Sequence, residues 1–145
     1  MADINPTFSL YHRTLRQPSS GLSSIIGNFS GSRKSQEIVR ATQTTLELWK
    51  FNKSTSEVSR LVVQNAYCNI RAIASFKVVK STKDLILLTS DSGTLSIIEF
   101  DSVNNKFTAV RSETFYKTGV RRLSPGEYIS VDPNGRAAMI GAIER

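Results

Sequence analysis

Apolar and polar residues alternate along most of the chain, and this two-residue period is typical of β-strands. Strands are predicted at 22–29, 37–42, 45–51, 58–63, 69–76, 85–89, 94–100, 107–114, 128–131 and 137–143. Clusters of turn-forming residues separate them, as in Asp132-Pro-Asn-Gly135. Short strands at this spacing, without a helical stripe, indicate an all-β protein built as a sandwich, barrel or propeller.

An internal repeat favours the propeller. The segment EIVRATQTTLELWKFN, which begins at Glu37, resembles DLILLTSDSGTLSIIEFD, which begins at Asp84. The alignment pairs Ile38 with Leu85, an offset of 47 residues, and Phe51 with Phe100, an offset of 49, with two extra residues in the second hairpin. A repeat of roughly 40 to 50 residues is that of β-propeller blades, each with four strands.

The predicted organisation is an irregular N-terminal segment at 1–21 followed by a partial N-terminal β-propeller at 22–145. At the observed period the chain holds about three four-stranded blades, whereas propellers typically have about four to eight. The run at 137–143 resembles the second strand of an unfinished blade. We therefore expect an incomplete β-propeller, with the remainder of the propeller or a partner chain needed to close the fold.

The composition gives 19 Lys and Arg against 12 Asp and Glu, a net charge of +7 in 145 residues. An excess of positive charge points to acidic partners such as nucleic acid. The basic residues are scattered, however, with no run longer than pairs such as Arg33-Lys34. We therefore expect any association with RNA to be indirect, and keep a basic RNA-binding module as the alternative. No apolar run is long enough to cross a membrane, and no secretory signal is apparent.

The sequence contains few of the residues that catalytic or metal sites require. His12 is the only histidine and Cys68 the only cysteine, so the sequence predicts no metal site, no cofactor and no enzyme. Cys68 is expected to be a small buried residue, and Asp91 a turn residue. Glu47 and Glu99 hold related places in the two repeats and are predicted to point outward from their strands.

Three arginines near the end of the chain are the candidate partner contacts. Arg121 and Arg122 are adjacent and are the strongest candidates for an interaction surface, although a solvated surface is the simpler interpretation. Arg136 follows the Asp-Pro-Asn-Gly turn and is predicted first to brace a neighbouring loop or carboxylate, with a partner contact as the alternative.

Several motifs carry a family resemblance. They are GNFSG at 27–31, SDSG at 90–93, RRLSPG at 121–126 and VDPNGRA at 131–137. The chain resembles the N-terminus of the splicing factor 3b subunit 3 family, large proteins of three β-propellers whose architecture is shared with the large subunits of damaged-DNA-binding protein and of cleavage and polyadenylation specificity factor. The resemblance implies a non-catalytic nuclear scaffold of pre-mRNA splicing, in the particle that recognises the branch point, with other splicing factor 3b subunits as partners. A scaffold from the ubiquitin-ligase or cleavage-factor branch is a further alternative.

Overall fold

The computed structural model describes residues 20–32, 36–79, 81–115 and 126–141. These residues form ten strands: β1 (Ser23–Gly27), β2 (Glu37–Ala41), β3 (Thr45–Asn52), β4 (Glu57–Asn65), β5 (Ile70–Lys77), β6 (Asp84–Ser90), β7 (Thr94–Asp101), β8 (Lys106–Thr114), β9 (Ile129–Val131) and β10 (Ala138–Ile140). The first nine begin and end within two residues of the predicted bounds; β10 ends at Ile140, and residues 142 and 143 of the tenth predicted strand lie outside the described residues. The all-β prediction is confirmed.

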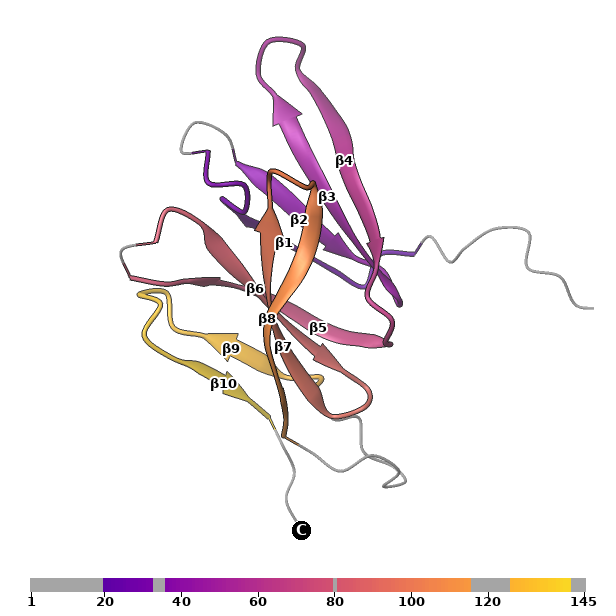
Figure 1. Cartoon of the computed structure of the whole chain (residues 1–145), viewed down its shortest axis with the longest axis vertical. Helices are drawn as coiled ribbons and strands as arrows, with labels where there is room; N and C mark the ends of the chain where they lie inside the picture. The colour runs from indigo at the N-terminus through magenta and orange to yellow at the C-terminus, as the bar shows by residue number, and fades with distance from the viewer. Residues whose placement is uncertain (1–19, 33–35, 80, 116–125, 142–145) are drawn as a thin grey trace, which may run out of the picture.

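The strands form three antiparallel sheets that lie beside one another (Figure 1). The first sheet has the order β1-β2-β3-β4 and the second β5-β6-β7-β8, while β9 and β10 form a two-stranded third sheet. Strands β1, β5 and β9 each begin a sheet, and β5 contacts both β1 and β9. This is the arrangement of inner strands around a propeller axis, and the ring is not closed within the described residues.

The hydrophobic core lies mainly between the first two sheets. Fully buried side chains include Leu48 of the first sheet and Ile86 of the second, both with no exposed surface. Burial of one such side chain stabilises a fold by about 1.5–3 kcal/mol. Phe100 and Phe107 extend the core within the second sheet, with ring centroids 5.3 Å apart in an edge-to-face arrangement.

The cross-strand pairing refines the internal repeat. Leu48 pairs with Val39 in the first sheet, and Ile97 pairs with Leu87 in the second. The β-bulges at Leu48/Trp49 and Ile97/Ile98 confirm the offset of 49 between β3 and β7. The offset between β2 and β6 is 48, because Ile38 opposite Trp49 corresponds to Ile86 opposite Ile98. The predicted match of Ile38 with Leu85 was wrong by one residue.

The hairpin turns explain this difference. The Thr42 hydroxyl accepts a hydrogen bond from the Thr45 amide at 3.0 Å, and the Ser90 hydroxyl accepts one from the Thr94 amide at 3.3 Å. Thr42 and Ser90 are thus equivalent, and the second turn has one extra residue rather than two. Gly93 in that turn adopts a φ of 74°, which a residue with a Cβ rarely does.

The outer strands carry matched β-bulges. The register of β3 with β4 shifts between Leu48 and Trp49, and that of β7 with β8 shifts between Ile97 and Ile98. The positions again differ by 49 residues. A bulge bends the outer strand and increases its twist, so the same irregularity in both sheets supports their description as two blades of one propeller.

Candidate partner-binding surface

Arg136 lies in the β9–β10 turn, where it contacts the first residue of the same turn. Its Nε donates a hydrogen bond to Asp132 Oδ2 at 2.6 Å, and both residues reach solvent. This hydrogen bond, followed by one from the Asn134 amide, lowers the pKa of the Asp132 carboxyl. Arg136 therefore has a carboxylate partner, and its side chain is exposed. A contact with another protein stays a prediction.

Arg121 and Arg122 lie outside the described residues. Just after them, Gly126 packs on the second sheet: the Thr89 hydroxyl, which is fully buried, donates to the Gly126 carbonyl at 2.6 Å. The Pro-Gly motif of the sequence thus ends at a buried contact between the second sheet and the segment that leads into β9.

The β9–β10 turn also packs tightly on the end of β5. A Cβ added to Gly135 would lie 1.7 Å from the Lys77 carbonyl oxygen, and Gly135 has a φ of 67°. Beside this contact, a cavity of about 460 Å³ opens between β1, β5 and β9. Asp84 and Asp132 line it together with Lys77, so its charges are mixed and provide no phosphate cradle.

Glu47 is the centre of a polar cluster on the first sheet. Its carboxylate accepts hydrogen bonds from Arg40 Nη1 at 3.2 Å and from Trp49 Nε1 at 2.9 Å, and lies 3.7 Å from Arg60 Nη1. Glu47 was predicted to point outward from its strand, but it is only 7% exposed and is therefore buried. The alternation of apolar and polar residues in β3 was predicted correctly, but neighbouring long side chains cover Glu47.

Many of the basic residues have acidic partners. Besides Arg40, Arg60 and Arg136, Lys83 lies 3.1 Å from Glu99 and Arg111 lies 2.7 Å from Glu113. Direct phosphate binding uses Lys and Arg side chains that are available to the nucleic acid backbone. The pairing of these five cations argues against a concentrated phosphate-binding face on the described surface.

The remaining acidic and sulfur groups have structural surroundings. Glu37 is fully buried, and its carboxylate accepts hydrogen bonds from the Phe29 amide at 3.0 Å and the Ser30 amide at 2.8 Å. Cys68 is half-buried beside the core, where burial and then the charge of Asp91 raise the pKa of its thiol. Within the described ranges, no three His, Cys, Asp or Glu residues gather to hold a metal ion.

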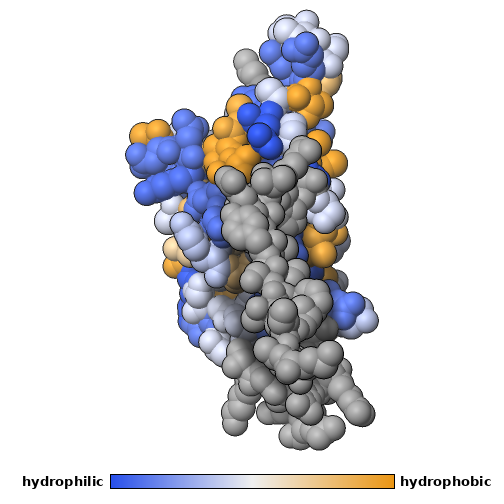
Figure 2. Space-filling model, turned by 90° about the vertical axis from the view of Figure 1, so that its right-hand side faces the viewer, coloured by the Kyte–Doolittle hydropathy of each residue, from blue (hydrophilic) through white to orange (hydrophobic). Residues whose placement is uncertain are grey.

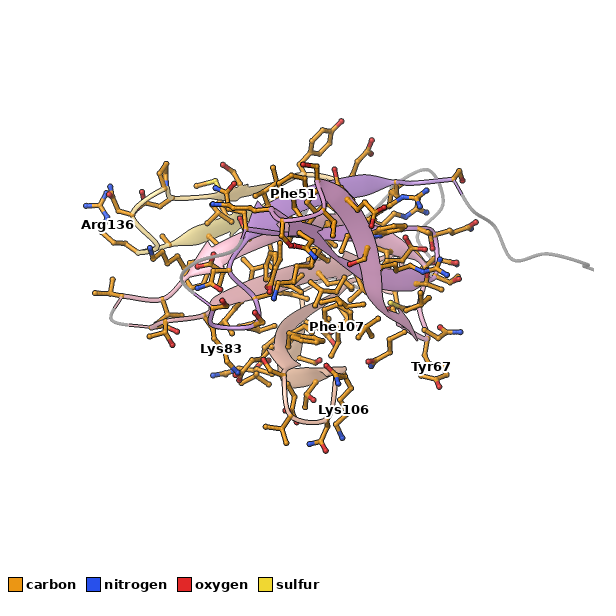
Figure 3. All side chains as sticks on the ribbon, turned by 90° about the horizontal axis from the view of Figure 1, so that it is seen from above. Phe51, Tyr67, Lys83, Lys106, Phe107 and Arg136 are labelled. Atoms are coloured by element: carbon orange, nitrogen blue, oxygen red, sulfur yellow. The ribbon has the colours of Figure 1, made fainter. Side chains whose placement is uncertain are left out.

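Sequence reasoning missed the corner formed by the β4–β5 connection. Tyr67 in this connection is 91% exposed and has a φ of 55°. Arg71 is exposed at a β-bulge between Ile70 and Ala72. Figure 3 shows Tyr67 and Arg136 at opposite ends of the molecule. The alternating pattern gave no signal for this corner, because it predicted a regular strand over 69–76.

Exposed apolar side chains form a further feature of the first sheet. Ile26, Phe51, Val58 and Val63 are each more than two fifths exposed. Figure 2 shows apolar side chains in separate patches below the polar tip of the β3–β4 hairpin. Among the described residues there is no helix with the length and hydropathy of a membrane span.

Comparison with known proteins places these features in context. A family model described as the RSE1/DDB1/CPSF1 first beta-propeller matches residues 22–145. The chain is 43% identical over 145 residues to pre-mRNA-splicing factor RSE1 of Debaryomyces hansenii, covering all of this chain and 12% of the relative. It is 42% identical to the probable splicing factor 3B subunit 3 of Dictyostelium discoideum and 39% identical to splicing factor 3B subunit 3 of Drosophila melanogaster. Each of these two matches covers 94% of this chain and 11% of the relative.

Proposed function

Because the chain belongs to the RSE1/DDB1/CPSF1 first β-propeller family, we propose that it forms the start of a non-catalytic nuclear scaffold in a pre-mRNA splicing particle of the splicing factor 3b type. The observation that carries this proposal is the identity of 39–43% to proteins named as splicing factors. The three antiparallel sheets fit the propeller architecture of this family.

The proposed role is to bind other splicing factor 3b subunits, with any association with RNA made through them. Ion pairs support contact with RNA through other subunits rather than directly, because they engage a large part of the positive charge of the described residues. The paired residues are Arg40, Arg60, Lys83, Arg111 and Arg136. The alternative of direct RNA binding is favoured by the net charge of +7.

Affinity purification of the tagged whole protein from nuclear extract tests the scaffold role. We expect the other splicing factor 3b subunits in stoichiometric amounts, and their retention after nuclease treatment. Recovery of ubiquitin-ligase or cleavage-factor subunits in their place would contradict the splicing assignment and favour another branch of the family.

RNA binding at two ionic strengths separates the scaffold from the RNA-binding module. Contacts with phosphates release counterions, so a module that makes six to ten of them would lose roughly 10³–10⁵-fold in affinity between about 50 and 200 mM salt. For a scaffold we expect only weak binding that does not depend on RNA sequence. Tight, sequence-dependent binding by the protein alone at physiological salt would contradict our proposal.

A further inference from the structure

We propose that the corner containing Tyr67 and Arg71 is a protein-docking site that binds an acidic segment of a partner subunit. In this site the Arg71 guanidinium would pair with a partner carboxylate, and the Tyr67 ring would pack against the partner's apolar side chains. The inference rests on the proposed scaffold function and names the surface and the partner chemistry for it.

The first support is that Arg71 differs from the other described arginines in having no carboxylate partner among the described residues. Of the five arginines in the described residues, Arg40, Arg60, Arg111 and Arg136 each have a carboxylate at ion-pair distance. Arg71 has none there and is exposed. Its charge is therefore available to a group from outside this part of the molecule.

The second support is the backbone that presents Arg71. Ile70 pairs with Ser90 and Ala72 with Thr89, which leaves Arg71 as the extra residue of a bulge in β5. Bulges are frequent where a side chain must be turned away from the regular sheet direction. This bulge places Arg71 at the wall of a cavity of about 310 Å³, at the start of β5.

The cavity suits a carboxylate. Gln43, Asn69 and Gly21 also line it. Asp91 is the neighbouring acid, and it accepts a hydrogen bond from Asn69 Nδ2 at 2.7 Å. The Asn69 amide is thus engaged by Asp91, and the Arg71 guanidinium at the same wall favours an acidic group, since hydrogen bonds between charged groups are the stronger ones.

The third support is the rigid presentation of Tyr67. The Asn65 side chain accepts a hydrogen bond from the Tyr67 amide at 2.7 Å. On either side, the Ala66 amide donates to the Thr44 carbonyl and the Ile70 amide donates to the Gln43 carbonyl, both at 2.8 Å. The backbone of the connection is thus tied to the β2–β3 turn while the ring is 91% exposed.

A tyrosine side chain has few rotatable bonds and so loses little conformational entropy on binding, and Tyr and Arg are enriched among the residues that dominate interface energies. Tyr67 has a left-handed backbone, with a φ of 55°, which is uncommon for a residue other than glycine.

Photo-crosslinking in the whole protein tests the site. The photoreactive residue p-benzoylphenylalanine replaces Tyr67, and the protein is purified with its bound subunits and irradiated. Tyr128, which is 71% exposed, is replaced in the matched control. We expect position 67 to crosslink to a segment of another subunit that contains Asp or Glu, and position 128 not to crosslink to that segment.

Charge reversal then tests the role of Arg71. Arg71→Glu should reduce the crosslink from position 67 by about tenfold or more, as expected for a residue that dominates an interface, whereas Arg71→Lys should retain part of it. Replacement of the crosslinked partner acid by Lys should restore the crosslink in the Arg71→Glu variant. Co-purification of other subunits through the remaining surface checks that Arg71→Glu is folded.

Several outcomes would overturn the site. Crosslinks to RNA alone, or only to other parts of the same protein, would show a different occupant. Absence of a crosslink while the splicing subunits co-purify would refute the docking site and leave the scaffold function standing. Failure of the unmodified protein to retain any splicing subunit would refute the scaffold function, and the docking site with it.

Discussion

The side chain of Gln64 in β4 hydrogen-bonds both backbone polar groups of Phe107 in β8. Its Nε2 donates to the Phe107 carbonyl at 2.8 Å, and its Oε1 accepts from the Phe107 amide at 2.7 Å. One side chain therefore makes the two backbone hydrogen bonds that a neighbouring strand would make, and it joins the outer strands of the two sheets. Because Phe107 is 5% exposed and belongs to the core, this pair couples the packing of the first sheet to that of the second.

Gln64→Ala should destabilise the first propeller. The substitution leaves the Phe107 amide and carbonyl without partners in a buried setting, which costs about 1–3 kcal/mol for each unsatisfied group. Chemical denaturation of the propeller measures the loss. Thr108→Ala, at an exposed neighbour on β8, is the control and should change stability by less than about 0.5 kcal/mol. Equal effects of the two substitutions would contradict the coupling.

Gly135→Ala should prevent the β9–β10 turn from packing on β5. The added Cβ would lie 1.7 Å from the Lys77 carbonyl oxygen, and the φ of 67° disfavours any side chain. Hydrogen exchange of the β9 and β10 amides should become faster in the variant. Asn134→Ala, in the same turn but exposed, should leave exchange unchanged. Unchanged exchange in Gly135→Ala would refute the contact.

Glu47→Gln should destabilise the first sheet by about 1–3 kcal/mol, because it weakens the hydrogen bonds of a buried carboxylate beside two arginines. Arg60→Ala should cost less than about 1 kcal/mol, since that arginine is half-exposed and its ion pair is longer. Urea denaturation of both variants gives the comparison. A larger effect of Arg60→Ala would contradict the central position of Glu47.

Arg136→Ala should raise the pKa of Asp132 toward the ordinary value of about 3.9. In the folded protein the hydrogen bond from Arg136 lowers this pKa, so the interaction stabilises the fold above the unfolded pKa and is lost as the pH falls through the folded pKa. Titration of the Asp132 carboxyl by NMR measures the shift. Asp101, whose pKa is lowered mainly by Asn104, is the internal control and should titrate as before. An unchanged Asp132 titration would refute the pair.

The fold could largely be predicted from the sequence because each strand of a propeller blade shows its own alternation of apolar and polar residues. The alternation and turn residues gave nine strands to within two residues, and the repeat gave the blade period. The predicted offset of 47 residues at β2 was one residue too small, because the hairpin that contains Gly93 has one extra residue rather than two. The apolar residues on both sides of the hairpin are similar enough to align in either register. Glu47 was misjudged because its carboxylate contacts Arg40 and Arg60 on the two neighbouring strands, and these contacts depend on packing across the sheet.

The candidate site was less predictable for a physical reason. Arg71 is exposed at a bulge, and a bulge shifts register without changing composition. Tyr67 follows Asn65, whose side chain forms the local turn, but an isolated tyrosine between strands is as compatible with burial as with exposure. Neither residue has a sequence motif, whereas Arg136 lies in a recognisable turn and forms its ion pair within it.

Ile97→Ala should cost as much as Leu48→Ala in the whole protein. The two positions are equivalent in the repeat, yet Leu48 is fully buried between the first two sheets while Ile97 is half-buried within these 145 residues. If further blades continue the ring, they cover Ile97 as the second sheet covers Leu48, and each substitution should then cost about 2–5 kcal/mol. Hydrogen exchange of the β3 and β7 amides in the two variants gives the comparison, with Thr108→Ala as control. A clearly smaller effect at Ile97 would show that the rest of the propeller does not cover Ile97.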